Sequence, residues 1–291
     1  LTHPFDGGYN NIGDINDSLD NSLTVMTYDQ SPYLLGINPL KIDLLAMEFL
    51  YGGDEEANIG SDYYDLDPLL FQATNSLGFT DARMSILDYG GQDSINAGYF
   101  NNGIFMNLQP GSWSNFYSAA PILVSSNFDG TSAQTASSFD MYIEIDVASD
   151  DDILGFGQLY ISSNTFIEGC VLTEYNDILF DNDAANLIEC SGGDDHVSSS
   201  YGDDYIFGGL GFDHVSLYGS ADDYASTYSG VSDDGGGIYR LSNGDRVVDL
   251  NSVEEISFFD ESGRVTSIFS IENFEGTDPG IIDTDPGYSV I

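Results

Sequence analysis

Positive charge is scarce in this sequence. The 291 residues include five Lys and Arg against 49 Asp and Glu, which gives a formal net charge of −44. Nucleic acids and anionic membranes are bound by basic side chains that replace condensed counterions, so neither is expected as a partner. No run of about 18 apolar residues is present to span a membrane. Hydrophobic residues still make up 41% of the chain, which is enough apolar surface for a folded protein rather than a disordered acidic tail.

A nine-residue repeat runs from residue 172 to residue 225. Its six units are LTEYNDILF, DNDAANLIE, CSGGDDHVS, SSYGDDYIF, GGLGFDHVS and LYGSADDYA. The sixth position carries an acid or an amide, in the order Asp177, Asn186, Asp195, Asp204, Asp213 and Asp222. The eighth position is apolar, in the order Leu179, Ile188, Val197, Ile206, Val215 and Tyr224. Residues 208–216 match the GGxGxDxUx motif of calcium-binding parallel β-helices at every fixed position.

This spacing predicts a parallel β-roll that binds calcium. Glycine permits the turn and exposes carbonyl oxygens, aspartate supplies an anionic oxygen, and the apolar eighth residue faces a narrow core. Two units make one coil, so each loop stacks on its second neighbour, and the gaps between stacked loops hold about four calcium ions. One column is then Asp177, Asp195 and Asp213, and the other is Asn186, Asp204 and Asp222. The loop glycines expected beside these ions are Gly192, Gly193, Gly202, Gly208, Gly209, Gly211 and Gly219.

The cysteines and two of the three histidines lie in or beside the repeats. Cys170 and Cys190 are too few for a disulfide framework or a four-thiolate zinc site, so they either form one bridge across adjacent coils or stay reduced. His196 and His214 occupy the outward-facing seventh position one coil apart. We therefore expect them to stack on one face as simply exposed side chains rather than as a metal site.

Outside the repeats the predicted elements are short. Pro39, an apolar stripe and the pair Gly52-Gly53 predict one helix over about residues 39–51. Asn243-Gly244 between two alternating runs predicts a β-hairpin. The stretch 276–291, rich in Asp, Pro and Gly, predicts a flexible tail.

Several further segments carry a family resemblance. Residues 1–10 read LTHPFDGGYN, residues 25–28 read VMTY, residues 86–93 read ILDYGGQD and residues 106–114 read MNLQPGSWS. In this order they are similar to the end of HExxHxxGxxHPxxYN, a Met-turn, WDxGGxDT and INLxxGxFS. With the repeats, the chain resembles the serralysin-type secreted zinc metalloendopeptidases, which are metzincins with a C-terminal RTX β-roll. The resemblance implies a remnant of the catalytic domain at 1–57, a calcium-binding β domain at 58–275 and the tail at 276–291.

The resemblance implies a zinc site in the first part of the chain. His3 would be the third zinc ligand, Met26 the apolar floor beneath the metal, and Tyr28 the catalytic hydroxyl that coordinates zinc or steadies the oxyanion. Three imidazoles leave one position for a water that the zinc acidifies. The sequence holds no HExxH, so the chain is expected to be inactive alone, and zinc is expected only where an upstream HExxH segment is present.

The resemblance also implies two calcium sites before the repeats. One is implied at Asn58, Gly60, Asp62, Asp88 and Gly90, and the second at Gly91, Asp93, Phe166 and Glu168. The first three residues correspond to positions where the family presents backbone oxygens, which tolerate a change of side chain.

The predicted fold is mainly β. It consists of a parallel β-roll of calcium-binding nonapeptide repeats with flanking β-sandwich-like strands, preceded by the α+β remnant of a metzincin catalytic domain. The function implied is the C-terminal portion of a secreted zinc metalloendopeptidase that acts on protein substrates, reaches the extracellular space by a type I route, and couples folding to secretion through calcium. The alternative is a non-catalytic extracellular structural or adhesive protein with the same calcium scaffold.

Overall fold

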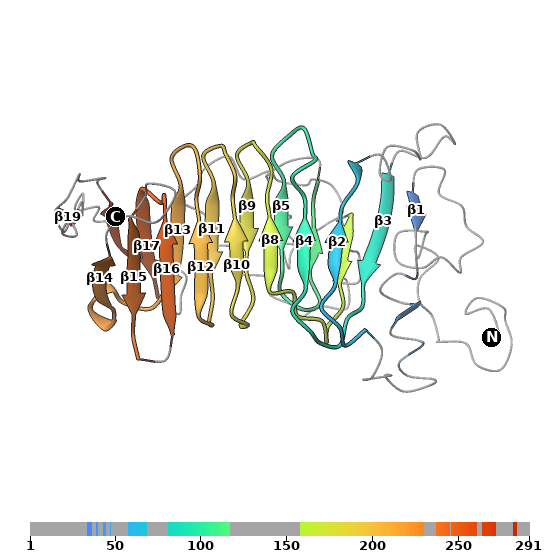
Figure 1. Cartoon of the computed structure of the whole chain (residues 1–291), viewed down its shortest axis with the longest axis horizontal. Coiled ribbons are helices and arrows are strands. Elements are labelled where there is room, and N and C mark those ends of the chain that lie inside the picture. Colours follow the sequence, from blue (N-terminus) through green and yellow to red (C-terminus); the bar gives the residue numbers. More distant parts are fainter. Residues whose placement is uncertain are drawn as a thin grey trace, which may run out of the picture.

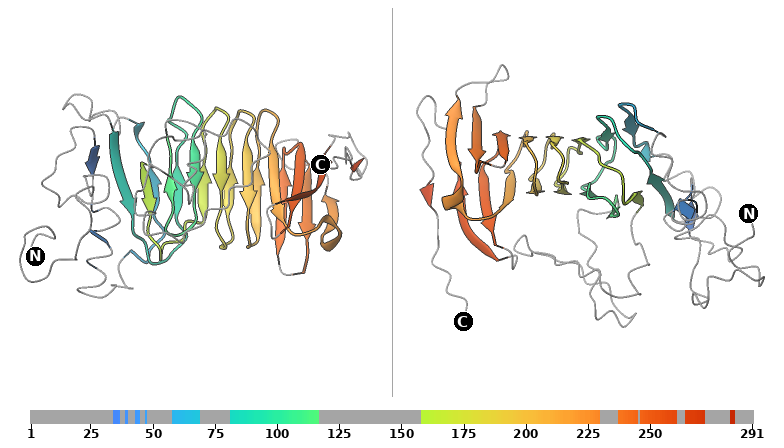
Figure 2. Two further views of the ribbon diagram at one scale, coloured as in Figure 1. Left: turned by 180° about the vertical axis from the view of Figure 1, so that it is seen from behind. Right: turned by 90° about the horizontal axis from the view of Figure 1, so that it is seen from below.

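The fold is mainly β, with strands lying side by side along the long axis of the molecule (Figure 1). A computed structural model describes residues 34–36, 39, 43, 44, 47, 58–68, 81–116, 158–229, 237–244, 246–260, 264–271 and 282–283. Within this described part the strands form one seven-stranded, one eight-stranded and one four-stranded sheet. Figure 2 shows the same stack from behind and from below.

The seven-stranded sheet contains the odd-numbered units of the repeat. Its strands, in spatial order, are β19 (Ile282–Asp283), β18 (Val265–Ser270), β17 (Glu255–Phe259), β13 (His214–Tyr218), β11 (His196–Ser199), β9 (Ile178–Phe180) and β5 (Phe105–Asn107). Strands β5 to β17 are parallel, whereas β18 and β19 pair antiparallel. Leu179 is in register with Val197, and Val197 with Val215. The predicted pairing of each unit with its second neighbour is therefore confirmed here.

The eight-stranded sheet contains even-numbered units of the repeat. Its strands, in spatial order, are β14 (Ala225–Ser229), β15 (Ile238–Ser242), β16 (Val247–Asn251), β12 (Asp204–Phe207), β10 (Leu187–Glu189), β8 (Gly169–Val171), β4 (Ser94–Asn96) and β2 (Tyr63–Asp65). Strands β2 to β16 are parallel, and β14, β15 and β16 are antiparallel neighbours. The predicted Asn243-Gly244 hairpin is confirmed, because it joins β15 to β16 with Gly244 at φ +88°.

The four-stranded sheet lies next to the start of the coil. It consists of β1 (Leu34–Gly36), β3 (Asp81–Ile86), β7 (Leu159–Ile161) and β6 (Trp113–Ser114), in that order. Strands β1, β3 and β7 are parallel, and β6 is antiparallel to β7. The strands that flank the repeats thus either extend the two large sheets or form this third one.

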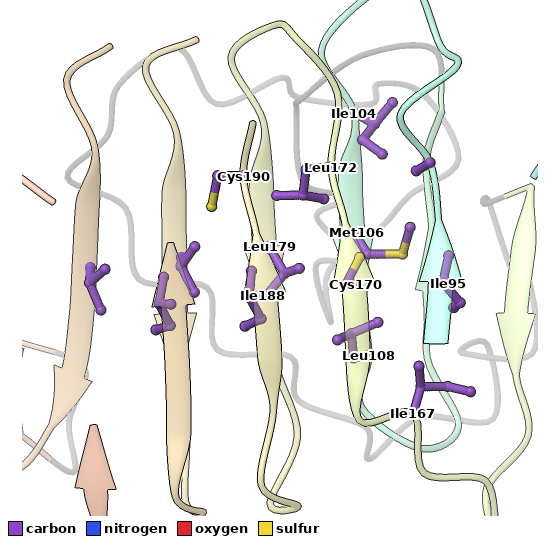
Figure 3. Close-up of a cluster of buried hydrophobic side chains, with 14 of the residues drawn as sticks. Ile95, Ile104, Met106, Leu108, Ile167, Cys170, Leu172, Leu179, Ile188 and Cys190 are labelled. Atoms are coloured by element: carbon purple, nitrogen blue, oxygen red, sulfur yellow. The ribbon is translucent and has the colours of Figure 1, made fainter. Parts of the chain in front are cut away.

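The core lies between the two large sheets. Leu179, Val197 and Val215 enter it from one sheet, and Ile188 and Ile206 from the other, each at most 1% exposed. Burying one such side chain is worth about 1.5–3 kcal/mol, so each short strand contributes to the stability of its coil. Figure 3 shows part of this core, including Leu179 and Ile188, and Cys170 and Cys190 are buried in the same cluster. Both cysteines are free thiols, which answers the question of a bridge.

Two other predicted segments are described only in part. Asp43, Leu44 and Met47 have helical backbone within the predicted helix 39–51, and its remaining residues lie outside the described part except for Pro39. Within the predicted tail 276–291, β19 pairs with β18, so those two residues belong to a sheet. None of the described helical residues belongs to a helix long and apolar enough to cross a bilayer.

Candidate metal-binding columns

A column of acidic residues runs along one edge of the seven-stranded sheet. Asp177, Asp195, Asp213 and Glu254 directly precede β9, β11, β13 and β17. We call them the first column. The backbone N–H of each member donates to the carboxylate of the next: Asp177 to Asp195 Oδ1 at 2.7 Å, Asp195 to Asp213 Oδ1 at 3.0 Å, and Asp213 to Glu254 Oε2 at 2.7 Å. The three predicted aspartates are thus brought together, and a fourth acid follows them.

A second column runs along the eight-stranded sheet. It consists of Asp62, Asp93, Glu168 and Asn186, which precede β2, β4, β8 and β10, and Asp204 at the start of β12. Asp62 N–H donates to Asp93 Oδ1 at 2.7 Å, Asp93 N–H to Glu168 Oε2 at 2.8 Å, and Asn186 N–H to Asp204 Oδ1 at 3.1 Å. Acidic residues from outside the repeats therefore belong to the same column as Asn186 and Asp204 of the repeats.

Buried carboxylate oxygens without partners mark both columns. Asp93, Asp195 and Asp213 are at most 2% exposed, and the Oδ2 atom of each has no hydrogen-bond partner in the described part of the chain. Burial raises the pKa of Asp195 to about 9, with the charges of Asp177 and Asp213 adding to the effect. Burial also raises the pKa of Asp213 to about 7, helped by Glu254 and Asp194. Among the described residues no salt bridge involves Asp93, Asp195 or Asp213, and a hard divalent cation that prefers oxygen ligands fits such carboxylates.

Three carboxylates gather where the second column begins. Oxygens of Asp62, Asp88 and Asp93 lie within 4.8 Å of one another and could hold a metal ion. The Tyr64 hydroxyl donates to Asp88 Oδ2 at 2.5 Å. Burial raises the pKa of Asp93 and of Glu168. The resemblance assigned Asp93 to a different ion from Asp62 and Asp88, whereas the structure brings these three acids into one cluster.

The backbone positions predicted for these sites are near the cluster. The Asn58 carbonyl accepts from Tyr89 N–H at 3.1 Å, and the Asp62 carbonyl from Ser94 N–H at 3.0 Å. A carbonyl oxygen has two lone pairs, so each can still serve a cation. Gly91 has φ +147°, and a Cβ there would lie 2.0 Å from the Gly60 carbonyl oxygen. Gly90 also has positive φ, and Phe166 is half-exposed just before Glu168.

The repeat loops stack in direct backbone contact. A Cβ at Gly211 would lie 1.9 Å from the Gly193 carbonyl oxygen, and a Cβ at Gly202 would lie 2.1 Å from the Ala184 carbonyl oxygen. Only glycine fits such an approach, because real Cβ atoms do not come this close to a carbonyl. Five predicted loop glycines also have positive φ, namely Gly193, Gly202, Gly209, Gly211 and Gly219. Gly192 and Gly208 lie in the same loops without it.

The prediction that Asp222 continues the second column is wrong. Ser220 caps a short 3₁₀ turn, η3 (Ala221–Asp223), in which the Ser220 and Asp223 side chains reciprocally cap the backbone. The turn leaves Asp222 exposed, and the following strand β14 pairs antiparallel with β15 instead of stacking on β12. Gly219 has φ +116° ahead of this turn, and its N–H donates to the Phe259 carbonyl at 2.9 Å. A local capping box has overridden the ninefold pattern here.

Arg246 takes the place beside Asp204 that the sequence predicted for a cation. Its Nη2 lies 3.3 Å from Asp204 Oδ2 and also donates to Ser199 Oγ, and both charged side chains are at most 1% exposed. Asp181, which the sequence interpretation did not select, is buried nearby: it accepts from Ser200 N–H at 2.6 Å, and its Oδ2 has no partner among the described residues. Burial, followed by the charge of Asp204, raises the pKa of Asp181 to about 8.

The two repeat histidines stack as predicted, but they are not simply exposed. The rings of His196 and His214 lie 4.5 Å apart between centroids, and both side chains are partly buried. His196 Nε2 pairs with Ser216 Oγ at 3.0 Å and His214 Nε2 with Ser257 Oγ at 2.8 Å. Burial, followed by the neighbouring His214, lowers the pKa of His196 to about 3. Their role is therefore packing and hydrogen bonding along the outer face of the sheet.

The predicted zinc site cannot be placed. His3, Met26 and Tyr28 lie outside the described residues.

Sequence reasoning missed three functional residues, namely Glu254, Asp181 and Arg246, since none of them occupies a sixth position of a repeat unit. Comparison with protein-family models and with curated proteins gives no match to this chain.

Proposed function

We propose that the two large sheets form a calcium-binding β-roll and that the chain is the C-terminal portion of a secreted, serralysin-like zinc metalloendopeptidase. One observation carries the calcium part: Asp195 and Asp213 are stacked and buried, and each keeps a carboxylate oxygen without a partner in the described part. Removing one unpaired carboxylate from water costs several kcal/mol. Calcium offsets this cost because it takes six to eight oxygen ligands in flexible geometry.

Calcium binding of this kind couples folding to location. The ion binds the folded coil and not the unfolded chain, so its concentration sets the folding equilibrium. At low intracellular calcium the stacked acids repel one another, and this repulsion shifts the equilibrium towards the unfolded roll. In the extracellular space calcium folds it, which suits export of an unfolded chain by a type I route.

The calcium part is tested by chelation. After exhaustive treatment with EGTA we expect the β signal in circular dichroism to be lost or the melting temperature to fall sharply, because the column acids lose their counter-charge. Adding calcium back should restore both, and the same concentration of magnesium should not, since magnesium demands a smaller and more rigid octahedral site. An unchanged spectrum and melting temperature in EGTA would show that the roll does not depend on calcium.

The peptidase part depends on the sequence resemblance at residues 1–28. A protein in which an HExxH segment precedes these residues should retain stoichiometric zinc and cleave casein, and His3→Ala should lose both, because a catalytic zinc site uses three protein ligands. Tyr28→Phe should lower turnover more than zinc content, since the hydroxyl acts chiefly on the oxyanion. Metal analysis beside a casein assay measures this. Full activity of His3→Ala would instead favour the non-catalytic structural or adhesive role.

A further inference from the structure

Glu254 holds the place of a repeat aspartate although it lies outside the repeats. Asp213 follows Asp195 by 18 residues, whereas Glu254 follows Asp213 by 41. The strand register is nevertheless the same: His196 pairs with His214, and His214 pairs with Glu255. Since each column residue directly precedes its strand, Glu254 stands over Asp213 as Asp213 stands over Asp195. The hydrogen bond from Asp213 N–H to Glu254 Oε2 repeats the link between the earlier members.

Oxygen atoms converge in the gap between Asp213 and Glu254. Asp213 is 2% exposed, and its Oδ2 atom has no hydrogen-bond partner in the described part. A Cβ at Gly208 would meet the Ser252 carbonyl oxygen at 2.0 Å and Asp213 Oδ2 at 2.5 Å. The unpartnered Asp213 Oδ2 atom and the Ser252 carbonyl oxygen therefore both lie beside Gly208, and Glu254 contacts Asp213 through its hydrogen bond to the Asp213 N–H.

No arginine in the described part of the chain forms a salt bridge with the acids of this gap. Among the salt bridges of the described residues, those made by arginine use Asp249 and Asp204, and none involves Asp213 or Glu254. The second column differs at this point, because Arg246 supplies a built-in cation beside Asp204. The Asp213 and Glu254 carboxylates and the Ser252 carbonyl are oxygen groups of the kind that a hard divalent cation prefers as ligands.

We propose that a calcium ion binds between the last repeat loop and the segment 252–254, held by the Asp213 and Glu254 carboxylates and the Ser252 carbonyl. This proposal rests on the proposed function, in that the first column binds calcium. The site lies past the gaps that the repeat predicts, because two of its ligands, from Ser252 and Glu254, come from the connection between β16 and β17. It ties the repeats to the antiparallel strands β17, β18 and β19 at one end of the sheet.

Counting bound ions tests the site. Calcium binding to the full chain is measured by equilibrium dialysis with radioactive calcium, for the wild type, Glu254→Gln and Glu189→Gln. The Glu254→Gln side chain keeps an oxygen that can accept from Asp213 N–H but loses the charge, so we expect one calcium ion fewer per chain with a wild-type circular dichroism spectrum at saturating calcium. Glu189 is exposed on β10 and serves as a charge-matched control that should keep the full count.

A second variant decides the case if Glu254→Gln fails to fold. Glu254→Asp retains a shorter carboxylate and should keep the full ion count, with one ion bound at least about tenfold more weakly. If either folded variant binds the same number of ions as the wild type with the same affinities, the terminal site is overturned while calcium binding by the repeats stands. A wild-type chain that binds no calcium would overturn the proposed function together with this site.

Discussion

Two aspartates at the same repeat position have different surroundings. Asp177 is fully engaged by the protein: Oδ1 accepts from Ile104 N–H at 2.7 Å, and Oδ2 accepts from Thr173 N–H at 2.7 Å and from the Thr173 hydroxyl at 2.9 Å. Asp195 has an unpartnered Oδ2 within the described part. Burial accordingly raises the pKa of Asp177 only to about 6, where further hydrogen bonds oppose it, against about 9 for Asp195.

This contrast predicts opposite effects of one substitution. Asp195→Asn should weaken calcium binding by at least about tenfold and leave the metal-free fold as stable or more stable, because it removes a buried carboxyl group that folding forces to stay protonated well above its ordinary pKa. Asp177→Asn should change calcium affinity less and should lower metal-free stability by about 1–3 kcal/mol, because its amide group cannot accept all the donors of Ile104 and Thr173. Isothermal titration and urea unfolding in EGTA measure the two effects. Equal losses of affinity would mean that protein donors do not govern the quality of these sites.

At the scale of elements, the ninefold spacing of residues predicted the repeat strands, but it did not predict strand pairs between residues far apart in the sequence. The ninefold period identified β9 to β13, their stacking, and buried positions such as Leu179 and Ile188, because each of these follows from neighbouring residues in one coil. Glu254 could not be found in this way, since 41 residues separate it from Asp213. Its alignment depends on β17 pairing with β13, which leaves no periodic signal in the sequence.

Local structure also explains why the ninefold period gave a wrong prediction for the last repeat unit. The unit LYGSADDYA fits the acid and apolar positions, but Ser220 and Asp223 also form a capping box, and local hydrogen bonds at a turn compete with the stacked loop. β16 then pairs with β12 and brings Arg246 to Asp204. A single arginine 42 residues from its partner belongs to no motif, so sequence motifs could not predict this ion pair. For the zinc site, the predicted residues lie outside the described part, so that prediction stays a prediction.

At the scale of the whole molecule, calcium bound as proposed would compete with protons for the carboxylates of the two columns. Several column carboxylates have raised pKa values, in the range of about 6 to about 9 for Asp177, Asp195, Asp204 and Asp213. The folded, metal-free chain therefore retains protons that the unfolded chain releases from pH 4 upward. Stability rises with pH only where the unfolded state binds more protons, and here it binds fewer.

The metal-free protein should consequently lose stability as pH rises from about 4 to about 9, on the order of several kcal/mol, and it should be most stable near pH 4. With saturating calcium the slope should reverse, since calcium binds the ionised carboxylates and acid displaces it. Melting temperatures at pH 4.5, 6 and 8, in EGTA and in calcium, test this prediction. Parallel slopes in the two conditions would contradict it.

The register of the stacked coils also restricts how the length of this molecule can change. Each coil is linked to the next by strand pairs 18 residues apart, and side chains alternate between core and surface along each strand. Inserting a single residue in a strand would turn every following side chain of that strand to the opposite face. Inserting 18 residues would add one coil and leave all neighbours in place. Such a domain can therefore lengthen in evolution by duplication of whole coils.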